Sequence, residues 1–182
     1  GCGEGLEKSQ GNFEETTLTG RIEDYRAALD HLEKSGKVDA SRLGVVGSSM
    51  GGMVAITVQD PRVKAMAVMA TPYKPIGLGK PHALGNKILY YELPSGHRLN
   101  AQFYAEIERY NLLDAVRNAP PILIIHGSQD PLVPAEHAIR LYEAASEPKR
   151  LEIIEGADHV FSKPEHLQKA ISLILEWFRK HL

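Results

Sequence analysis

The chain has 182 residues with one cysteine, and its 21 lysines and arginines nearly balance its 23 aspartates and glutamates. This length predicts a single globular domain, and the balanced charge argues against a nucleic acid or an anionic membrane as partner. Cys2 cannot form an internal disulfide, and neither a membrane-length apolar run nor a signal peptide is present in the sequence. We therefore expect a cytoplasmic protein that acts on a small molecule.

The N-terminal part of the chain predicts a loop followed by an amphipathic helix. Residues 1–18 show neither a helical nor a strand period and contain many loop-forming residues. Apolar residues then recur at helical spacing, and Gly36 supplies a C-terminal stop, so a helix is expected over about residues 20–35. The recurring residues are Ile22, Tyr25, Leu29 and Leu32.

Strands alternate with helices along most of the remaining chain. The predicted strands are short apolar runs without polar alternation, which is typical of buried parallel strands. These runs cover residues 42–46, 63–69, 122–125 and 151–154. Helical patterns cover residues from about 50 to 60, 134–145 and 165–179. The alternation predicts an α/β fold with a mostly parallel sheet and helices on both faces.

The stretch from Thr71 to Asn118 interrupts this alternation. It is rich in proline, glycine and tyrosine at first, and then helical around residues 100–116. We expect a cap or lid insertion at 71–118 above the C-terminal edge of the sheet, between core parts at 1–70 and 119–182. Its aromatic residues either line a ligand pocket or only pack the cap onto the sheet. They are Tyr73, Tyr90, Tyr91, Phe103, Tyr104 and Tyr110.

A Gly-x-Ser-x-Gly pattern joins the first predicted strand to the helix after it. It consists of Gly47, Ser49 and Gly51, and a strand-to-helix turn of this kind is typical of a nucleophile elbow. The glycines are expected to leave room for backbone packed against backbone. The turn would also aim the free N–H groups of the helix N-terminus at the reacting centre. Taken alone, the pattern is equally a small-residue turn that packs a helix on a sheet.

Two later strand ends carry the groups that activate a serine hydroxyl. Such a hydroxyl needs an imidazole base, and the imidazole needs a carboxylate that fixes its tautomer. Asp130 lies in HGSQDPLVP directly after the strand at 122–125, and His159 lies in GADH after the strand at 151–154. The chain order Ser, Asp, His is the order of α/β-hydrolases. These observations predict a catalytic triad of Ser49, Asp130 and His159.

The segments GSSMGG, HGSQDPLVP and GADHVFSKPEH resemble the elbow, acid loop and histidine loop of the α/β-hydrolase superfamily. They are most similar to its small carboxylesterases, including cinnamoyl and feruloyl esterases, and to acylaminoacyl-peptidase-like members. The resemblance implies that Ser49 is the nucleophile, His159 the general base and acid, and Asp130 the orienting acid, with the Met50 N–H as an oxyanion donor. It implies cleavage of small carboxylic esters through an acyl-enzyme. Two alternatives remain open, namely an aminopeptidase or acylaminoacyl peptidase with the same triad, and a non-catalytic module of hydrolase fold.

Other polar residues have simpler interpretations. Ser48 is expected to be a packed neighbour of the nucleophile, Asp158 a hydrogen-bonding loop residue, and His126 a residue that structures the turn after its strand. The remaining histidines considered show no metal-ligand spacing, so no metal and no cofactor are predicted. They are His82, His97, His137 and His166.

The glycine-rich start, Gly1-x-Gly3-x-Gly5, resembles the loop that follows the fourth strand in this superfamily. By that resemblance the preceding strands and a second oxyanion donor are absent, and we expect an N-terminally truncated hydrolase fold. Loss of one donor would slow acyl transfer by roughly 10²–10³-fold. The strand at 42–46 would then be an exposed edge that can pair with another chain.

Overall fold

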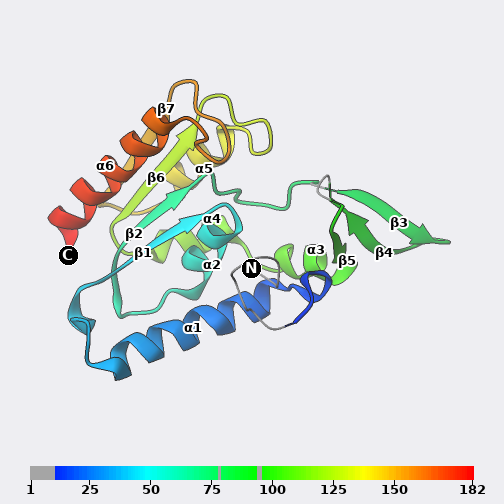
Figure 1. The fold of residues 1–182 in the computed structure, drawn as a ribbon, viewed down its shortest axis with the longest axis horizontal. Coiled ribbons are helices and arrows are strands. Elements are labelled where there is room, and N and C mark those ends of the chain that lie inside the picture. The colour runs from blue at the N-terminus through cyan, green and yellow to red at the C-terminus, as the bar shows by residue number, and fades with distance from the viewer. Residues whose placement is uncertain (1–10, 78, 94–95) are drawn as a thin grey trace.

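The computed structural model describes residues 11–77, 79–93 and 96–182. Cys2 and the run Gly1-x-Gly3-x-Gly5 lie outside the described residues. A four-stranded parallel sheet in the order β1-β2-β6-β7 forms the centre of the structure (Figure 1). Its strands are β1 (Leu43–Ser48), β2 (Val63–Met69), β6 (Ile122–Gly127) and β7 (Lys149–Ile154).

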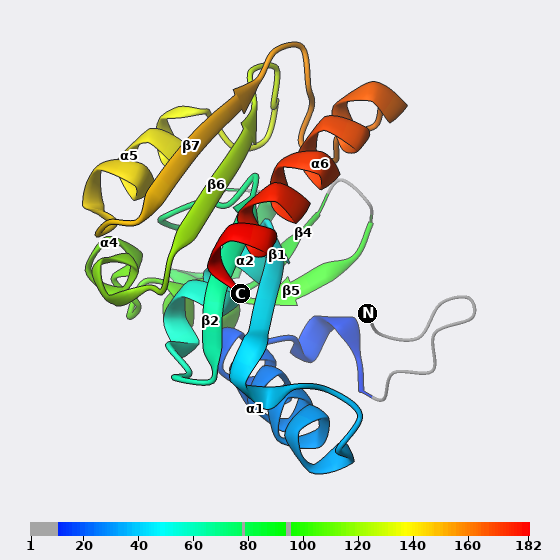
Figure 2. The ribbon, with the colours of Figure 1, turned by 90° about the vertical axis from the view of Figure 1, so that its left-hand side faces the viewer.

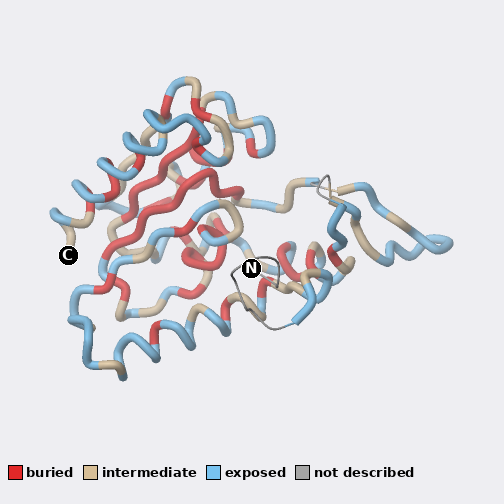
Figure 3. Tube along the Cα trace, viewed as in Figure 1, coloured by how far each residue is buried: buried red, intermediate tan, exposed pale blue. Residues whose placement is uncertain are grey.

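Four helices pack against this sheet and confirm the predicted α/β alternation. They are α1 (Leu18–Ser35), α2 (Met50–Val58), α5 (Glu136–Ala144) and α6 (Pro164–His181). Helix α6 crosses one face of the sheet, and α2 and α5 lie behind the strands on the other (Figure 2). Figure 3 shows that the two central strands, β2 and β6, are buried along most of their length.

The apolar strands alternate between two cores, one on each face of the sheet. Met66 and Ile124 belong to the core that contains α1, α2 and α5. Ala67 and Leu123, which are their chain neighbours, belong to the core under α6, together with Trp177. Successive side chains of a strand point to opposite faces, so continuous apolar runs supply both cores at once.

The helix boundaries follow from local chemistry. Helix α1 begins after Thr17, whose hydroxyl accepts a 3.0 Å hydrogen bond from the Gly20 N–H, and it ends at Gly36 with φ 63°. Pro164 begins α6, where its missing N–H costs no intrahelical bond. The described part of the chain also contains three short 3₁₀ turns, at Phe13–Glu15, Ala40–Arg42 and Val116–Asn118.

Residues 71–118 contain strands that the sequence patterns do not predict. A three-stranded antiparallel sheet extends away from the main body (Figure 1) and is followed by two short helices. These elements are β3 (Lys80–Leu84), β4 (Lys87–Glu92), β5 (Arg98–Asn100), α3 (Ala101–Ile107) and α4 (Leu112–Ala115). Strands β3 and β4 are largely exposed, so they lack the apolar run by which the central strands are identified. The domain boundaries at 70 and 119 stay a prediction.

The two short helices return to the main core. Phe103 and Ile107 of α3 and Leu112 of α4 are buried in the same apolar cluster as α1 and α2. The insertion is therefore anchored at its helical end. Among the described residues, no helix is both long and apolar enough to cross a membrane.

Candidate active site

Ser49 occupies the tight turn between β1 and α2. Its backbone has φ 51° and ψ −118°, a left-handed conformation that is costly for a residue with a side chain. The turn is held because the Ser49 N–H donates to the Met69 carbonyl at 2.8 Å, at the end of the adjacent strand. The Ser49 carbonyl accepts hydrogen bonds from Gly52 and Met53 in the first turn of α2. The serine is thus presented at the C-terminal edge of the sheet.

The three glycines around Ser49 have different surroundings. A β-carbon added to Gly47 would lie 2.6 Å from the Gly51 carbonyl oxygen, so Gly47 allows β1 and α2 to approach closely. A β-carbon at Gly52 would overlap the Thr71 side chain. At Gly51, by contrast, none of the described residues beyond its chain neighbours and the backbone of its own helix lies within 4 Å of such a carbon. The close-packing explanation expected from the motif is therefore correct for Gly47 and wrong for Gly51.

The structure brings Ser49, His159 and Asp130 into one hydrogen-bonded chain. The His159 Nδ1 atom lies 2.8 Å from Asp130 Oδ2, and Nε2 lies 3.2 Å from Ser49 Oγ. Because the carboxylate can only accept, Nδ1 carries the proton and Nε2 is free to accept the serine proton. The Asp130 side chain is fully buried, and that of His159 is 15% exposed. This is the arrangement that the sequence predicts for the three residues.

The Asp130 carboxylate is fixed by the backbone of its own loop. Its Oδ1 atom accepts hydrogen bonds from the N–H groups of Leu132 at 2.8 Å and Val133 at 2.9 Å. Its Oδ2 atom remains for the contact with His159. A carboxylate held by backbone donors on one oxygen presents the other in a fixed direction.

The acid loop and the histidine loop are bonded to one another. Ser128 Oγ accepts from the Gly156 N–H at 2.9 Å, and the Gln129 N–H donates to the Ala157 carbonyl at 3.0 Å. A β-carbon at Gly127 would overlap the Ala157 carbonyl oxygen, so glycine is needed for this approach. These contacts hold the two loops together independently of the side chains of Ser49, Asp130 and His159.

Met50 is the first residue of α2 and directly follows the serine. The N–H groups in the first turn of a helix have no intrahelical acceptor, and the helix dipole makes them favourable partners for an anion. The Met50 N–H is therefore placed where the sequence predicts an oxyanion donor. That role remains a prediction.

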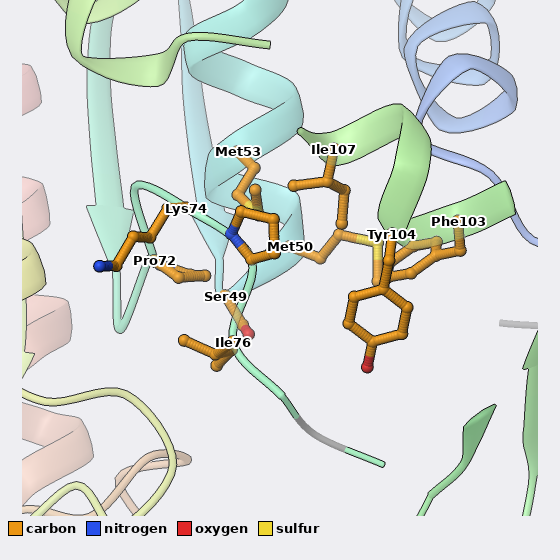
Figure 4. Close-up of a pocket in the computed structure, with 10 residues that line it drawn as sticks. Ser49, Met50, Met53, Pro72, Lys74, Ile76, Phe103, Tyr104 and Ile107 are labelled. Atoms are coloured by element: carbon orange, nitrogen blue, oxygen red, sulfur yellow. The ribbon is translucent and has the colours of Figure 1, made fainter. Parts of the chain in front are cut away.

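An apolar pocket of about 60 Å³ opens beside Ser49. Figure 4 shows its walls, which come from α2, from α3 and from the segment after β2. Lys74 is the charged side chain among the lining residues. The other lining residues are Met50, Met53, Pro72, Pro75, Ile76, Phe103, Tyr104 and Ile107. The sequence identifies no substrate-binding residue, although the position of 72–76 just after a central strand is a signal for such a role.

The six aromatic residues of the insertion do not share one environment. Phe103 and Tyr104 line the pocket beside Ser49. Tyr73 packs against the His137 ring at a centroid distance of 4.7 Å, and Tyr90 stacks on His82 at 4.6 Å. Phe103 and Tyr104 thus line the pocket, Tyr73 packs against α5 of the main body, and the contact of Tyr90 with His82 lies within the insertion itself.

His137 connects the start of the insertion to α5. The Tyr73 N–H donates to its Nδ1 atom at 3.1 Å, so the ring accepts at that nitrogen. Burial lowers the pKa of His137, and the positive charge of Lys74 lowers it further. The neutral ring and its contact with Tyr73 are thus favoured.

The other polar candidates lie outside the hydrogen-bonded chain of Ser49. Ser48 is exposed. Asp158 accepts hydrogen bonds from the backbone N–H and the hydroxyl of Ser162, which lower the pKa of its carboxyl and hold it within its own loop, as expected. In the part of the chain that the structure describes, no three histidine, cysteine, aspartate or glutamate side chains are grouped to hold a metal.

The fold and the geometry of this site place the protein in the α/β-hydrolase class. The chain belongs to the prolyl oligopeptidase family, whose family model matches residues 10–182. It is 31% identical over 180 residues to the esterase YjfP of Escherichia coli, covering 92% of this chain and 64% of that one. It is 33% identical over 164 residues to an uncharacterised protein of Mycobacterium tuberculosis, covering 90% and 53% of the two chains.

Two solved structures show the same fold. The esterase domain of a Rhodothermus marinus protein is 31% identical, with a TM-score of 0.74 over 93% of this chain and 71% of that one. Est1E of Butyrivibrio proteoclasticus, solved with ferulic acid, is 22% identical, with a TM-score of 0.80 over 95% and 74%. The chain spans about half the length of the first curated relatives that it matches, at 53%.

Proposed function

We propose that this chain carries the catalytic site of a serine hydrolase that cleaves carboxylic esters of small substrates through an acyl-enzyme on Ser49. The observation that carries the proposal is the hydrogen-bonded chain from Ser49 Oγ through His159 to Asp130, at 3.2 and 2.8 Å. Esterases among the relatives support ester substrates over other acyl compounds.

The proposed reaction has two halves that use the same groups. His159 Nε2 takes the Ser49 proton as the oxygen attacks the ester carbonyl, and the Met50 N–H stabilises the resulting oxyanion. The protonated imidazole then gives that proton to the leaving alcohol, and the acyl group stays on Ser49. A water molecule repeats the sequence on the acyl-enzyme and releases the acid. Asp130 stabilises the positive imidazole and remains ionised throughout.

The pocket beside Ser49 supports an apolar acyl group as the preferred part of the substrate. Its walls are mainly aliphatic and aromatic, so burial of an apolar group there is favourable at about 25 cal/mol per Å². Lys74 is the one charged residue among those that line it.

Family membership favours a second candidate activity. The prolyl oligopeptidase family is named after a peptidase. The same triad can attack an amide in an aminopeptidase or acylaminoacyl peptidase. Comparing p-nitrophenyl esters with aminoacyl and acylaminoacyl anilides separates the two. Higher kcat/KM for short acyl esters supports the esterase, and higher kcat/KM for the anilides supports the peptidase.

A fluorophosphonate probe tests the nucleophile directly. We expect an adduct on Ser49 in the wild-type chain and none in Ser49→Ala, with hydrolysis lowered on the order of 10⁶-fold. Ser48→Ala is the matched control, because it removes the neighbouring hydroxyl and should leave labelling intact. A folded wild-type protein that forms no adduct would instead support a non-catalytic module.

A further inference from the structure

His126 is a buried polar residue in an otherwise apolar strand. It follows Ile122–Ile125 in β6, and its exposed fraction is 0%. A polar group buried this deeply is unfavourable unless it forms hydrogen bonds, whereas an aliphatic residue would continue the strand at no such cost. The contacts of the ring therefore indicate what the histidine is for.

One nitrogen of His126 faces two acceptors of the acid loop. Nε2 lies 2.8 Å from the Val133 carbonyl oxygen and 3.4 Å from Asp130 Oδ2. Since a carbonyl and a carboxylate only accept, Nε2 carries the proton. No hydrogen-bond partner for Nδ1 is found among the described residues, so a second proton there would be buried and unpaired. The ring is therefore neutral and directs a single donor into the loop.

This donor closes the loop that presents the carboxylate. It connects the last part of β6 to Val133, whose own N–H donates to Asp130 Oδ1 at 2.9 Å. The same Nε2–H group also faces Asp130 Oδ2, which is the atom that accepts from His159 Nδ1. Backbone groups thus hold one carboxylate oxygen, and two imidazoles face the other.

We propose that His126 is a positioning residue, which holds Asp130 in the rotamer that aligns His159 with Ser49. The inference rests on the proposed function, because the alignment matters for catalysis only if Ser49 is the nucleophile. The alignment of Asp130 depends on the position of the His126 Nε2–H group more than on the volume of the ring.

Two amide substitutions test whether the Nε2–H donor, and not the imidazole ring as a whole, is what His126 contributes. The amide nitrogen of His126→Gln extends to about the place of Nε2, whereas that of His126→Asn ends near Nδ1. Because a catalytic group misplaced by about 1 Å can cost 10²-fold, we expect His126→Asn to lower kcat about 10- to 100-fold at unchanged KM, and His126→Gln to stay within about threefold. Ile122→Ala is the stability control, since Ile122 is fully buried in the same strand but lies outside the acid loop.

A second measurement does not depend on turnover. The proton shared by His159 Nδ1 and Asp130 should give a strongly downfield resonance in the ¹H NMR spectrum. We expect this resonance in the wild-type chain, in His126→Gln and in Ile122→Ala, and its loss or broadening in His126→Asn.

The proposal would be overturned if His126→Gln and His126→Asn had the same kcat and the same downfield resonance as the wild type. It would also be overturned if both variants lost kcat equally and in proportion to their loss of stability. If the folded wild type shows neither turnover nor a Ser49 adduct, the proposed function fails. The NMR comparison of the two variants then still decides whether His126 positions Asp130.

Discussion

The two glycines that flank Ser49 in the motif do different things at the level of single residues. Gly47 is required by contact, because any side chain would press on the backbone of α2. Gly51 lies within α2 with open space at its missing β-carbon, among the described residues. A glycine inside a helix is destabilising by about 1 kcal/mol relative to alanine when nothing else requires it.

Alanine substitutions at these glycines should have opposite effects. Gly47→Ala is expected to destabilise the chain by several kcal/mol or to prevent folding, because backbone on both sides must move. Gly51→Ala is expected to keep or raise the free energy of unfolding, by up to about 1 kcal/mol. Urea denaturation of the two variants measures both changes. A large loss in Gly51→Ala would mean that its space is filled by another part of the protein.

The hydrogen-bonded arrangement of Ser49, His159 and Asp130 is predictable from the sequence, whereas the pocket is not. Ser49, Asp130 and His159 each lie in the turn or loop after a strand that the sequence predicts, and parallel strands end at a common edge. Phe103 and Ile107 reach the pocket from α3, which directly follows the outer strand β5, and no local motif marks them. The contact of His126 with Asp130 depends equally on side-chain geometry that spacing does not reveal.

At the level of elements, a buried carboxylate joins α3 to the start of α1. Glu106 accepts from the Thr19 N–H at 3.2 Å and from Gln102 Nε2 at 2.8 Å. Burial opposes ionisation of Glu106, but the hydrogen bonds from Gln102 and Thr19 outweigh it and lower the pKa of the carboxyl. The negative charge also lies at the N-terminus of α1, where the helix dipole favours it. This contact attaches the pocket-forming helix to the core.

The contribution of Glu106 to stability should depend on pH. Its pKa is lower in the folded chain than the ordinary value of 4.5, so the stabilisation is present above about pH 4.5 and is lost as the pH falls through the folded pKa. Glu106→Gln should cost about 1–2 kcal/mol at neutral pH, because Thr19 and Gln102 both donate to the carboxylate and the new NH₂ group would place a donor against one of them. Denaturation of both proteins at successively lower pH should show the difference shrinking. A constant difference would contradict the role of the charge.

The strands of the central sheet are easier to predict from the sequence than the strands β3 and β4 of the insertion. β2 and β6 are buried on both faces, so their apolar runs are visible in the sequence. β3 and β4 are exposed and join through a two-residue turn that begins at Gly85, with φ 60°. That Gly-Asn turn is the one local signal for the hairpin.

At the scale of the whole molecule, β1 forms one edge of the central sheet. Among the described residues it pairs only with β2, and the Val46 side chain beside this edge is 50% exposed. Unpaired N–H and carbonyl groups along a strand can pair with another strand. Pairing of this edge with another chain stays a prediction.

Amide hydrogen exchange followed by mass spectrometry tests that prediction. In dilute protein, the peptide covering β1 should exchange faster than the peptide covering β6, because β6 is paired on both sides. Protection of β1 that increases with protein concentration would indicate pairing with a second copy. Slow exchange of β1 at every concentration would show that the edge is already covered.

The left-handed backbone at Ser49 is expected to cost stability at the same residue that the proposed reaction uses as nucleophile. Glycine adopts such a conformation freely, so Ser49→Gly should be about 1 kcal/mol more stable than Ser49→Ala, although both lack the hydroxyl. Thermal or urea denaturation of the pair measures the difference, and equal stability would mean that the turn is unstrained. Natural selection for folding alone would favour glycine at this position. Relatives that have lost catalysis are therefore expected to accumulate glycine where this chain keeps its serine.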